Sequence, residues 1–459
     1  MKKIIIALFV VIAIVAILPL IGNKATQEIL TTRVSVLTSN GLELKNASSE
    51  STYLRTKKHY EFLLRDAPKF IKHLNQYSDV QLPPYVDAML GGVLVGVDIE
   101  YSNFPLGSDI LVDIYPLSLS TNMISQMKKE DVNFYKYIEN LLQSKGVLYH
   151  ISYSVADGSF SGFIKNIDEN YTFDNSTKMI FKLREATYYG KGPLIAPKSL
   201  QSHISEINLE VIAPTKNIMF NFKNIASSST FHSSSTYASS ATIKTLVMNV
   251  KEKRGEETKV KVDDAKFNIS SNTQGEKAEF YTKSSFKEFE VKSDKLNLLL
   301  NGFNYDVSLD GVDKIAYEEF RKLTLNTKSN NSQAFEKELQ EAIIKIFSKG
   351  LELNIADFSV KKLSLENETS IDAFSLMAKL NVKQDNDLAK KIKSSPMTLI
   401  NNINIDSTIK LSKDFYVLIN KKVPITGLAN SFAKEEGNNL IFVIKLIDGK
   451  LSLNDKVIK

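Results

Sequence analysis

The sequence contains no cysteine and only five histidines. Without cysteine there can be no disulfide framework, no cysteine-ligated zinc, no thiol catalysis and no acylated lipoprotein cysteine. The histidines do not follow the spacing of a local zinc site, which leaves open only a site assembled from distant parts of the chain. They are His59, His73, His150, His203 and His232. We therefore expect no metal and no cofactor, and a fold stabilised by its core alone.

A strong excess of positive charge is also missing. The net charge is +6 over 459 residues, too dilute to indicate nucleic-acid binding. Hydrophobic residues make up 43% of the chain and charged residues 24%, as in folded globular proteins. Single cores stop growing at about 250–300 residues, so we expect several domains or one extended architecture, with a division near residues 190–205.

Only one long apolar run exists, at residues 4–22, and it carries no charge. About 20 apolar residues suffice to cross a bilayer. The run ends without the small-residue pattern of a cleavage site, which favours an uncleaved signal anchor over a cleaved signal peptide. Lysines before the run indicate a cytoplasmic N-terminus. The sequence thus predicts an inner-membrane protein with a transmembrane helix in residues 1–22 and a periplasmic body in residues 23–459. The predicted anchor residues are Ile4, Leu8, Phe9, Val15, Leu18 and Ile21.

Alternation of apolar and polar residues is the main pattern in the body, and it predicts half-buried β-strands. The clearest examples are residues 109–115, 149–155, 207–212, 218–222, 258–262, 296–301 and 440–446. Turns are expected where Asn or Asp precedes Gly, because these residues tolerate a positive φ. Such pairs begin at Asn40, Asp157, Asp310 and Asp448.

Helical periodicity is rarer. It predicts helices at residues 66–77, in the second half of 121–144, and at 312–323, 333–347, 388–400 and 426–435. The predicted fold class is therefore α+β: a long, mostly antiparallel β-meander with a few inserted helices, preceded by one transmembrane helix. The Ser-rich residues 225–243 are expected to form a strand and a turn rather than a flexible linker.

Residues 88–97 are expected to form a buried strand, in which Gly91, Gly92 and Gly96 mark a bulge or a close backbone approach rather than a dinucleotide site. The carboxylates of Asp109 and Asp113 share a strand face, which we interpret as a solvated face.

Catalytic motifs are weak. Ser-x-x-Lys, which occurs in penicillin-binding enzymes, appears at Ser125, Ser284 and Ser359, but no Lys-Thr-Gly accompanies it. His73 is expected to be a partly exposed surface residue of a helix. Asn170 lies in an N-x-T acceptor sequence, and the sequence does not reveal whether it is glycosylated. No catalytic residue is predicted.

The order of several segments resembles the YdgA-type family of bacterial envelope proteins. The resemblance rests on the leading apolar run, on Gly192-Pro193, and on residues 296–323, 351–382 and 444–458. It covers nearly the whole chain. Because this family is described by architecture and location and not by a reaction, it implies an anchored, β-rich envelope protein and no catalytic residues.

Three functions remain open. The first is a non-enzymatic protein whose sheet forms a groove for a lipid acyl chain or for an extended partner segment. The second is a structural or adaptor protein that holds an envelope protein near the inner membrane. The third, a hydrolase of envelope polymers, has no convincing candidate residue and is the least favoured.

Overall fold

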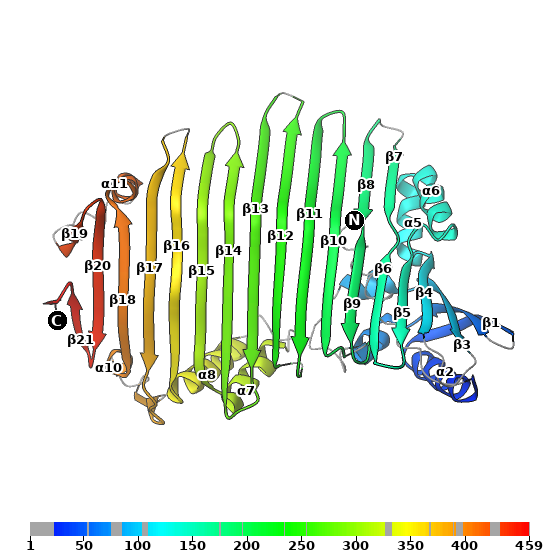
Figure 1. Ribbon diagram of the computed structural model, residues 1–459, viewed down its shortest axis with the longest axis horizontal. Coiled ribbons are helices and arrows are strands. Elements are labelled where there is room, and N and C mark those ends of the chain that lie inside the picture. The colour runs from blue at the N-terminus through cyan, green and yellow to red at the C-terminus, as the bar shows by residue number, and fades with distance from the viewer. Residues whose placement is uncertain are drawn as a thin grey trace. The chain divides into compact units, whose positions relative to one another are not determined.

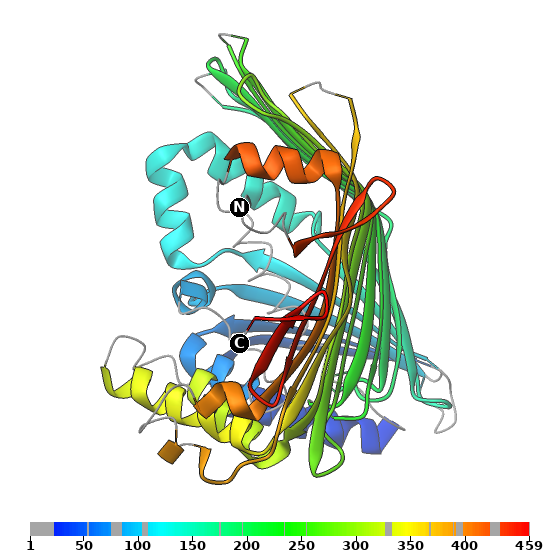
Figure 2. The same cartoon turned by 90° about the vertical axis from the view of Figure 1, so that its left-hand side faces the viewer.

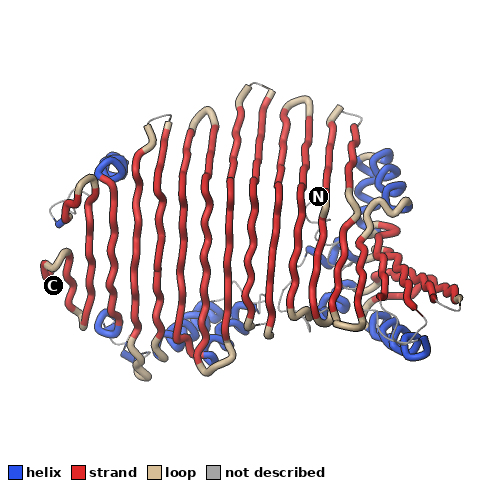
Figure 3. Tube along the Cα trace, in the orientation of Figure 1, coloured by secondary structure: helices blue, strands red, loops and turns tan. Residues whose placement is uncertain are grey.

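The structure is a computed structural model that describes residues 23–52, 55–74, 85–102, 109–173, 176–194, 196–233, 235–253, 255–325, 333–366, 369–388, 390–391, 398–422 and 432–458. The chain divides into two compact units, Met1–Ser234 and Ser235–Lys459. Long antiparallel strands dominate each unit (Figures 1 and 3).

The first unit begins with helix α2 (Asn23–Ser39) and the neighbouring strands β1 (Leu42–Ser51), β2 (Arg55–Leu64), β3 (Leu94–Ser102), β4 (Asp109–Ser118), β5 (Tyr149–Ser154) and β6 (Ser159–Ile164). Each strand pairs with the next in antiparallel register. Helices α3 (Ala67–Leu74) and α4 (Tyr85–Leu90) lie between β2 and β3, and α5 (Thr121–Glu130) and α6 (Val132–Gln143) between β4 and β5.

One face of these strands is the core. Side chains from α2, α3 and α4 pack on every second residue of the strands, as the sequence alternation requires. Leu30, Phe70 and Leu90 thus meet Phe62 and Ile114, all nearly inaccessible to solvent. The opposite face of the same strands carries polar side chains, which becomes important for the candidate site.

The rest of the first unit consists of β7 (Ile167–Thr172), β8 (Lys178–Arg184), β9 (Ala186–Lys191), β10 (Ser199–Ile212) and β11 (Lys216–Phe231). Strands β8 and β9 both pair with β10 and are two halves of one long strand, interrupted at Glu185, whose φ is +49°. A left-handed residue recurs inside β11 as Asn224. Residues 190–205 lie within this unit.

The second unit contains β12 (Tyr237–Glu252), β13 (Glu257–Asn272), β14 (Lys277–Lys292), β15 (Asn297–Asp313), β16 (Leu351–Leu365), β17 (Ile371–Val382), β18 (Ile403–Ser412) and β20 (Asn439–Ile447), in that spatial order. The short strands β19 (Lys434–Glu436), β21 (Lys450–Leu453) and β22 (Lys456–Val457) complete the edge. Left-handed residues recur here as Asp264 in β13 and Gly302 in β15.

The helices of the second unit lie at the ends of its strands. Helices α7 (Lys314–Leu325) and α8 (Gln333–Ser348) lie at one end and α11 (Lys413–Lys422) at the other, on the same side of the sheet (Figure 2). A short helix, α10 (Thr398–Asn402), precedes β18.

The predicted α+β class with a leading transmembrane helix is wrong. The described residues form antiparallel sheets with a few attached helices, and none of these helices is long and apolar enough to cross a membrane. Helix α2, which follows the apolar run, is rich in Thr and Ser. The run itself, residues 4–22 with the predicted anchor residues, lies outside the described residues. The predictions of a signal anchor and of a single-pass inner-membrane protein with a periplasmic body are wrong as well, because no helix among the described residues could cross a membrane.

Most predicted strands are confirmed, but several are longer than expected. Asp310-Gly311 is not a turn, because both residues lie inside β15. Residues 121–144 form two helices that meet at Asp131. Residues 85–90 are helical before β3 begins. Most of the predicted helix at 388–400 lies outside the described residues, and the predicted helix at 426–435 is wrong at its end, where Lys434 starts β19. The Ser-rich segment forms strands, as expected.

Candidate functional site

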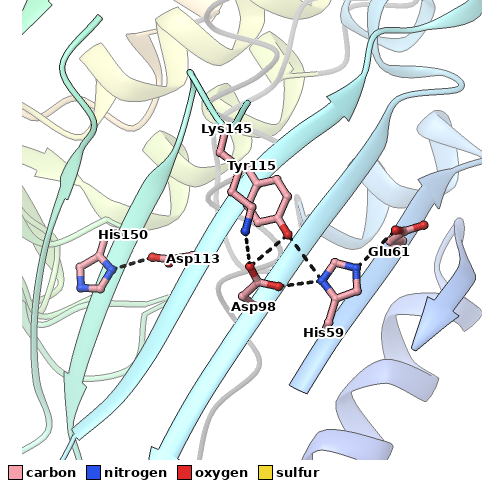
Figure 4. Close-up of polar contacts among 7 residues, drawn as sticks. All are labelled: His59, Glu61, Asp98, Asp113, Tyr115, Lys145 and His150. Carbon is pink, nitrogen blue, oxygen red and sulfur yellow. Dashed lines mark hydrogen bonds and ion pairs between the residues drawn. The ribbon is translucent and has the colours of Figure 1, made fainter. Parts of the chain in front are cut away.

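A row of ionisable side chains crosses the polar face of the first unit. His59 lies directly opposite Asp98, Asp98 opposite Asp113, and Asp113 opposite His150, on strands β2 to β5. Directly opposite residues of antiparallel strands point to the same face. The row therefore brings together four groups that are far apart in the sequence, as Figure 4 shows.

Asp98 is the centre of this row. Its Oδ1 lies 2.6 Å from Nδ1 of His59, and its Oδ2 accepts hydrogen bonds from Lys145 Nζ at 2.6 Å and Tyr115 Oη at 3.0 Å. Lys145 follows α6 with a φ of +51°. Its ammonium group also lies 4.1 Å from the centroid of the Tyr115 ring. The carboxylate is thus held by three donors from three parts of the chain.

These contacts shift the protonation equilibria of the row. Burial lowers the pKa of His59, but hydrogen bonds to Asp98 and Glu61 outweigh it, so the pKa lies above its ordinary value. Burial raises the pKa of Asp98, and the bonds from Lys145, His59 and Tyr115 reverse this and hold it below its ordinary value. Burial raises the pKa of Tyr115. The charged forms of Asp98 and His59 are therefore favoured together.

The second histidine has a different environment. Nδ1 of His150 lies 2.6 Å from Oδ1 of Asp113, and its ring stacks on Phe163 with 4.9 Å between centroids. Its backbone carbonyl accepts a hydrogen bond from Tyr188 Oη at 2.7 Å. Within the described part of the chain, Nε2 of His150 has no hydrogen-bond partner. This ring edge is available to a ligand.

The row forms the floor of a hollow of about 580 Å³, a volume typical of small-molecule sites. Its lining residues are Ser48, Glu50, Lys57, Lys58, His59, Asp98, Ile99, Glu100, Leu111, Asp113, Tyr115, Lys145 and His150. Three of the carboxylates are already paired: Asp98 with Lys145, Glu100 with Arg55, and Asp113 with His150. We call this site the polar hollow.

A second candidate site is one face of the sheet in the second unit. In the register of the strands, four neighbouring rows of directly opposite residues contain apolar or small hydroxyl side chains and no charge. Their large members include Phe267, Ile269, Phe280, Phe286, Phe303, Tyr305, Val307, Leu309, Ile355, Phe358, Val360, Phe374, Leu376, Leu380, Ile409 and Phe442. We call these rows the apolar face.

The apolar face is only partly covered. Phe415 of α11 packs near Val360 and Phe374, and Tyr317 and Ile346 of the other helices pack near Phe280 and Leu309. Between these ends, Phe267 is 40% exposed, Ile269 47% and Tyr305 36%. Neighbouring aromatic rings contact one another across the strands: Phe286 stacks on Phe303, and Phe303 meets Phe358 edge-on.

The structure agrees with some of the sequence-based predictions for single residues and contradicts others. His73 is buried, with 6% exposure, so the prediction of a surface position is wrong. Asp113 shares a face of β4 with Asp109 as expected, but it is bonded to His150 rather than simply solvated. At Gly96 the close neighbour is a side chain and not the expected backbone, because a Cβ there would lie 2.4 Å from Cε2 of Tyr115. Asn170 is exposed in β7.

The three Ser-x-x-Lys motifs do not come together. Ser125 lies in α5, Ser284 on the apolar face of β14 and Ser359 in β16. Among the described residues, no group of three His, Asp or Glu side chains is placed to hold a metal ion. The expectations of no cofactor and of no enzymatic activity stay predictions.

The polar hollow was not predicted from the sequence. His59 and Asp98 are separated by two helices, and only strand register brings them together. The only signal in the sequence was that each of four strands carries a charged residue or a histidine among its outward-facing positions. Ordinary solvated strand faces show the same pattern.

Comparison with family models, with curated proteins and with solved structures gives no match, so the resemblance to the YdgA-type family stays a prediction.

Proposed function

We propose that the apolar face of the second unit binds the acyl chains of lipids. The observation that carries this proposal is the half-exposed, charge-free middle of the face around Phe267, Ile269 and Tyr305. Contiguous apolar surface of this kind is uncommon on soluble monomers and usually marks a binding surface. Each methylene group that moves from water onto such a surface contributes about 0.8 kcal/mol.

The composition of the face favours an acyl chain over a protein segment. A polypeptide brings backbone N–H and C=O groups, whose burial costs free energy unless they find partners. The four rows offer only hydroxyl groups as polar partners, on small side chains such as Ser239 and Thr282 and on Tyr305. A hydrocarbon chain needs no polar partner. The other face of the same strands is charged, with ion pairs such as Lys244–Asp264 and Lys283–Asp306. Apolar ligands are thus directed to one face.

A matched pair of variants tests the proposal. Ile269→Glu places a charge on the apolar face, while Met377→Glu places it on the opposite face at a similarly exposed position, 52% against 47%. Binding is measured with a dansyl-labelled fatty acid and its displacement by palmitate. Ile269→Glu should weaken binding at least tenfold, which corresponds to about 1.4 kcal/mol, and Met377→Glu should leave it unchanged.

Two results would contradict the proposal. The wild-type protein could fail to bind the labelled fatty acid, or both variants could weaken binding equally. If the wild-type protein instead captures a polypeptide through residues that Ile269→Glu disrupts, while palmitate does not compete, the surface serves a protein partner.

A further inference from the structure

We propose that the polar hollow of the first unit, together with the aromatic side chains beside it, binds a neutral sugar. This inference is independent of the lipid site in the second unit. It rests on three observations: the pairing of most charges in the hollow, the polar atoms of Asp113 and His150 that have no partner among the described residues, and two exposed aromatic rings on the same face.

Most charges of the hollow argue for a neutral ligand, and the two charged lining residues without an ion pair among the described residues, Glu50 and Lys58, have opposite signs. Asp98 is bonded to Lys145 and His59, Glu100 to Arg55 and Lys57, and Asp113 to His150. An ionic ligand would have to compete with one member of a pair. A hydroxyl group can instead bond to the remaining lone pairs of a paired carboxylate, because each carboxylate has about four acceptor sites. Hydrogen bonds to charged groups are also stronger than those between neutral groups.

Asp113 and His150 present the polar atoms that such a ligand needs. Their side chains are 37% and 24% exposed. Among the described residues, the second carboxylate oxygen of Asp113 and Nε2 of His150 have no hydrogen-bond partner. An acceptor thus lies beside a ring nitrogen that donates or accepts according to its protonation. Vicinal hydroxyls of a sugar ring carry the matching donors and acceptors at adjacent positions.

Two aromatic rings extend this surface. Phe163 lies directly opposite His150 on β6 and is 42% exposed even though the imidazole stacks on it. Tyr189, on the adjacent strand β9, is 40% exposed and lies opposite Ser161, one step along the same face. Exposed rings on an otherwise polar face offer apolar surface to the C–H side of a sugar ring, while the polar groups bind its hydroxyls.

The strand register also indicates how a ligand would lie in the site. Asp113, His150 and Phe163 are consecutive members of one row across β4, β5 and β6. Neighbouring strands lie about 4.8 Å apart, so this row spans roughly the length of two sugar rings. The geometry therefore points to an oligosaccharide lying across the strands.

The test uses the full chain and a panel of neutral trisaccharides: maltotriose, cellotriose and chitotriose. Saturation-transfer NMR detects binding, and the imidazole resonances of His150 report its location. At least one sugar should bind saturably and shift these resonances. Phe163→Ala and Asp113→Asn should each weaken binding about tenfold or more. Val417→Ser in the second unit, at a 52% exposed position of α11, should leave it unchanged.

Circular dichroism establishes that each variant is folded. If Phe163→Ala does not fold, Tyr189→Ser takes its place, because this side chain is exposed. The proposal is overturned if no sugar of the panel binds, if binding leaves the His150 resonances unmoved, or if the Phe163 and Asp113 variants bind as the wild type does. Binding of inorganic phosphate but of no neutral sugar would also overturn it.

Discussion

Asp98 and Asp113 lie directly opposite each other on β3 and β4, and each is bonded by a histidine from its outer neighbour strand. Like charges directly opposite destabilise an antiparallel pair. Hydrogen bonds from His59 and Lys145 to Asp98, and the contact of His150 with Asp113, offset this repulsion.

The first prediction concerns His59. Its pKa is raised in the folded protein, so its contribution to stability is fully present below its unfolded pKa of about 6.5 and is lost as pH rises through the folded pKa. His59→Gln should therefore lower the free energy of unfolding more at pH 6 than at pH 9. Urea denaturation at both pH values measures the difference. An equal loss at the two pH values would contradict the assignment.

Asp98 has the opposite dependence. Its pKa is lowered, so its contribution is present above its unfolded pKa of about 3.9 and is lost as pH falls through the folded value. Asp98→Asn should cost stability at pH 7 and progressively less as the solution is acidified. Lys145 and His59 lose a partner in this variant, and NMR titration should show the pKa of His59 falling. An unchanged pKa of His59 would show that the bond between them is not formed in solution.

Gly96 controls the position of Tyr115. A Cβ at residue 96 of β3 would lie 2.4 Å from Cε2 of the ring of Tyr115, the residue directly opposite on β4. Gly96→Ala should destabilise the protein by about 1–3 kcal/mol, the usual cost of overpacking. Gly275→Ala is the control, since its nearest contact would be at 3.6 Å. Denaturation midpoints that fall equally in both variants would refute the role of the close approach.

Local sequence patterns correctly predicted those elements that depend only on neighbouring residues of the chain. Alternation identified β4, β5 and β20, and Asp448-Gly449 correctly marked a hairpin. The same rule failed at Asp310-Gly311, because β15 accommodates a positive φ inside the strand at a register shift with β14. Turn chemistry indicates a permitted backbone conformation, and strand pairing decides whether the chain reverses there.

The candidate sites needed information that spacing does not contain. His59, Asp98, Asp113 and His150 meet only because the register of three strand pairs places them in one row. The apolar face posed a different problem: strand register places Phe286, Phe303 and Phe374 on one side, and only helix packing shows that α7, α8 and α11 cover its ends. The helix expected in the second half of residues 121–144 is confirmed as α6, and the structure adds α5 before it, separated from α6 by Asp131.

Asp131 should therefore matter as a helix cap. Its backbone N–H bonds to Met127 O at the end of α5, and its Oδ1 accepts from the backbone N–H of Phe134 at the start of α6. Asp131→Ala keeps the first bond and removes the second, together with the longer contacts from Tyr171 Oη to the carboxylate at 3.4 and 3.5 Å, and should cost about 1 kcal/mol. Asp131→Asn keeps an acceptor and should cost much less. Urea denaturation compares the two variants, and equal losses would mean that the charge, not the cap, is responsible.

The last prediction concerns the attachment of α11 to the apolar face. Phe415 stacks on Phe374 of β17 with 5.5 Å between centroids and an interplanar angle of 18°. Ser412 fixes the start of this helix, since its Oγ accepts from the backbone N–H of Phe415 at 3.0 Å. Such a ring pair contributes about 0.5–1.5 kcal/mol beyond its burial. Phe415→Ala should therefore loosen α11 from the sheet without disturbing the strands.

Hydrogen exchange measures this directly. In Phe415→Ala the amides of α11 should exchange severalfold faster, while those of β17 keep their protection, because the strand is held by β16 and β18 on both sides. Val417→Ala is the matched control, since Val417 lies in the same helix and is 52% exposed. Faster exchange of the α11 amides in both variants would mean that changed helix propensity, and not the lost ring contact, is the cause. Unchanged exchange in Phe415→Ala would mean that the cap at Ser412 alone holds the helix against the sheet.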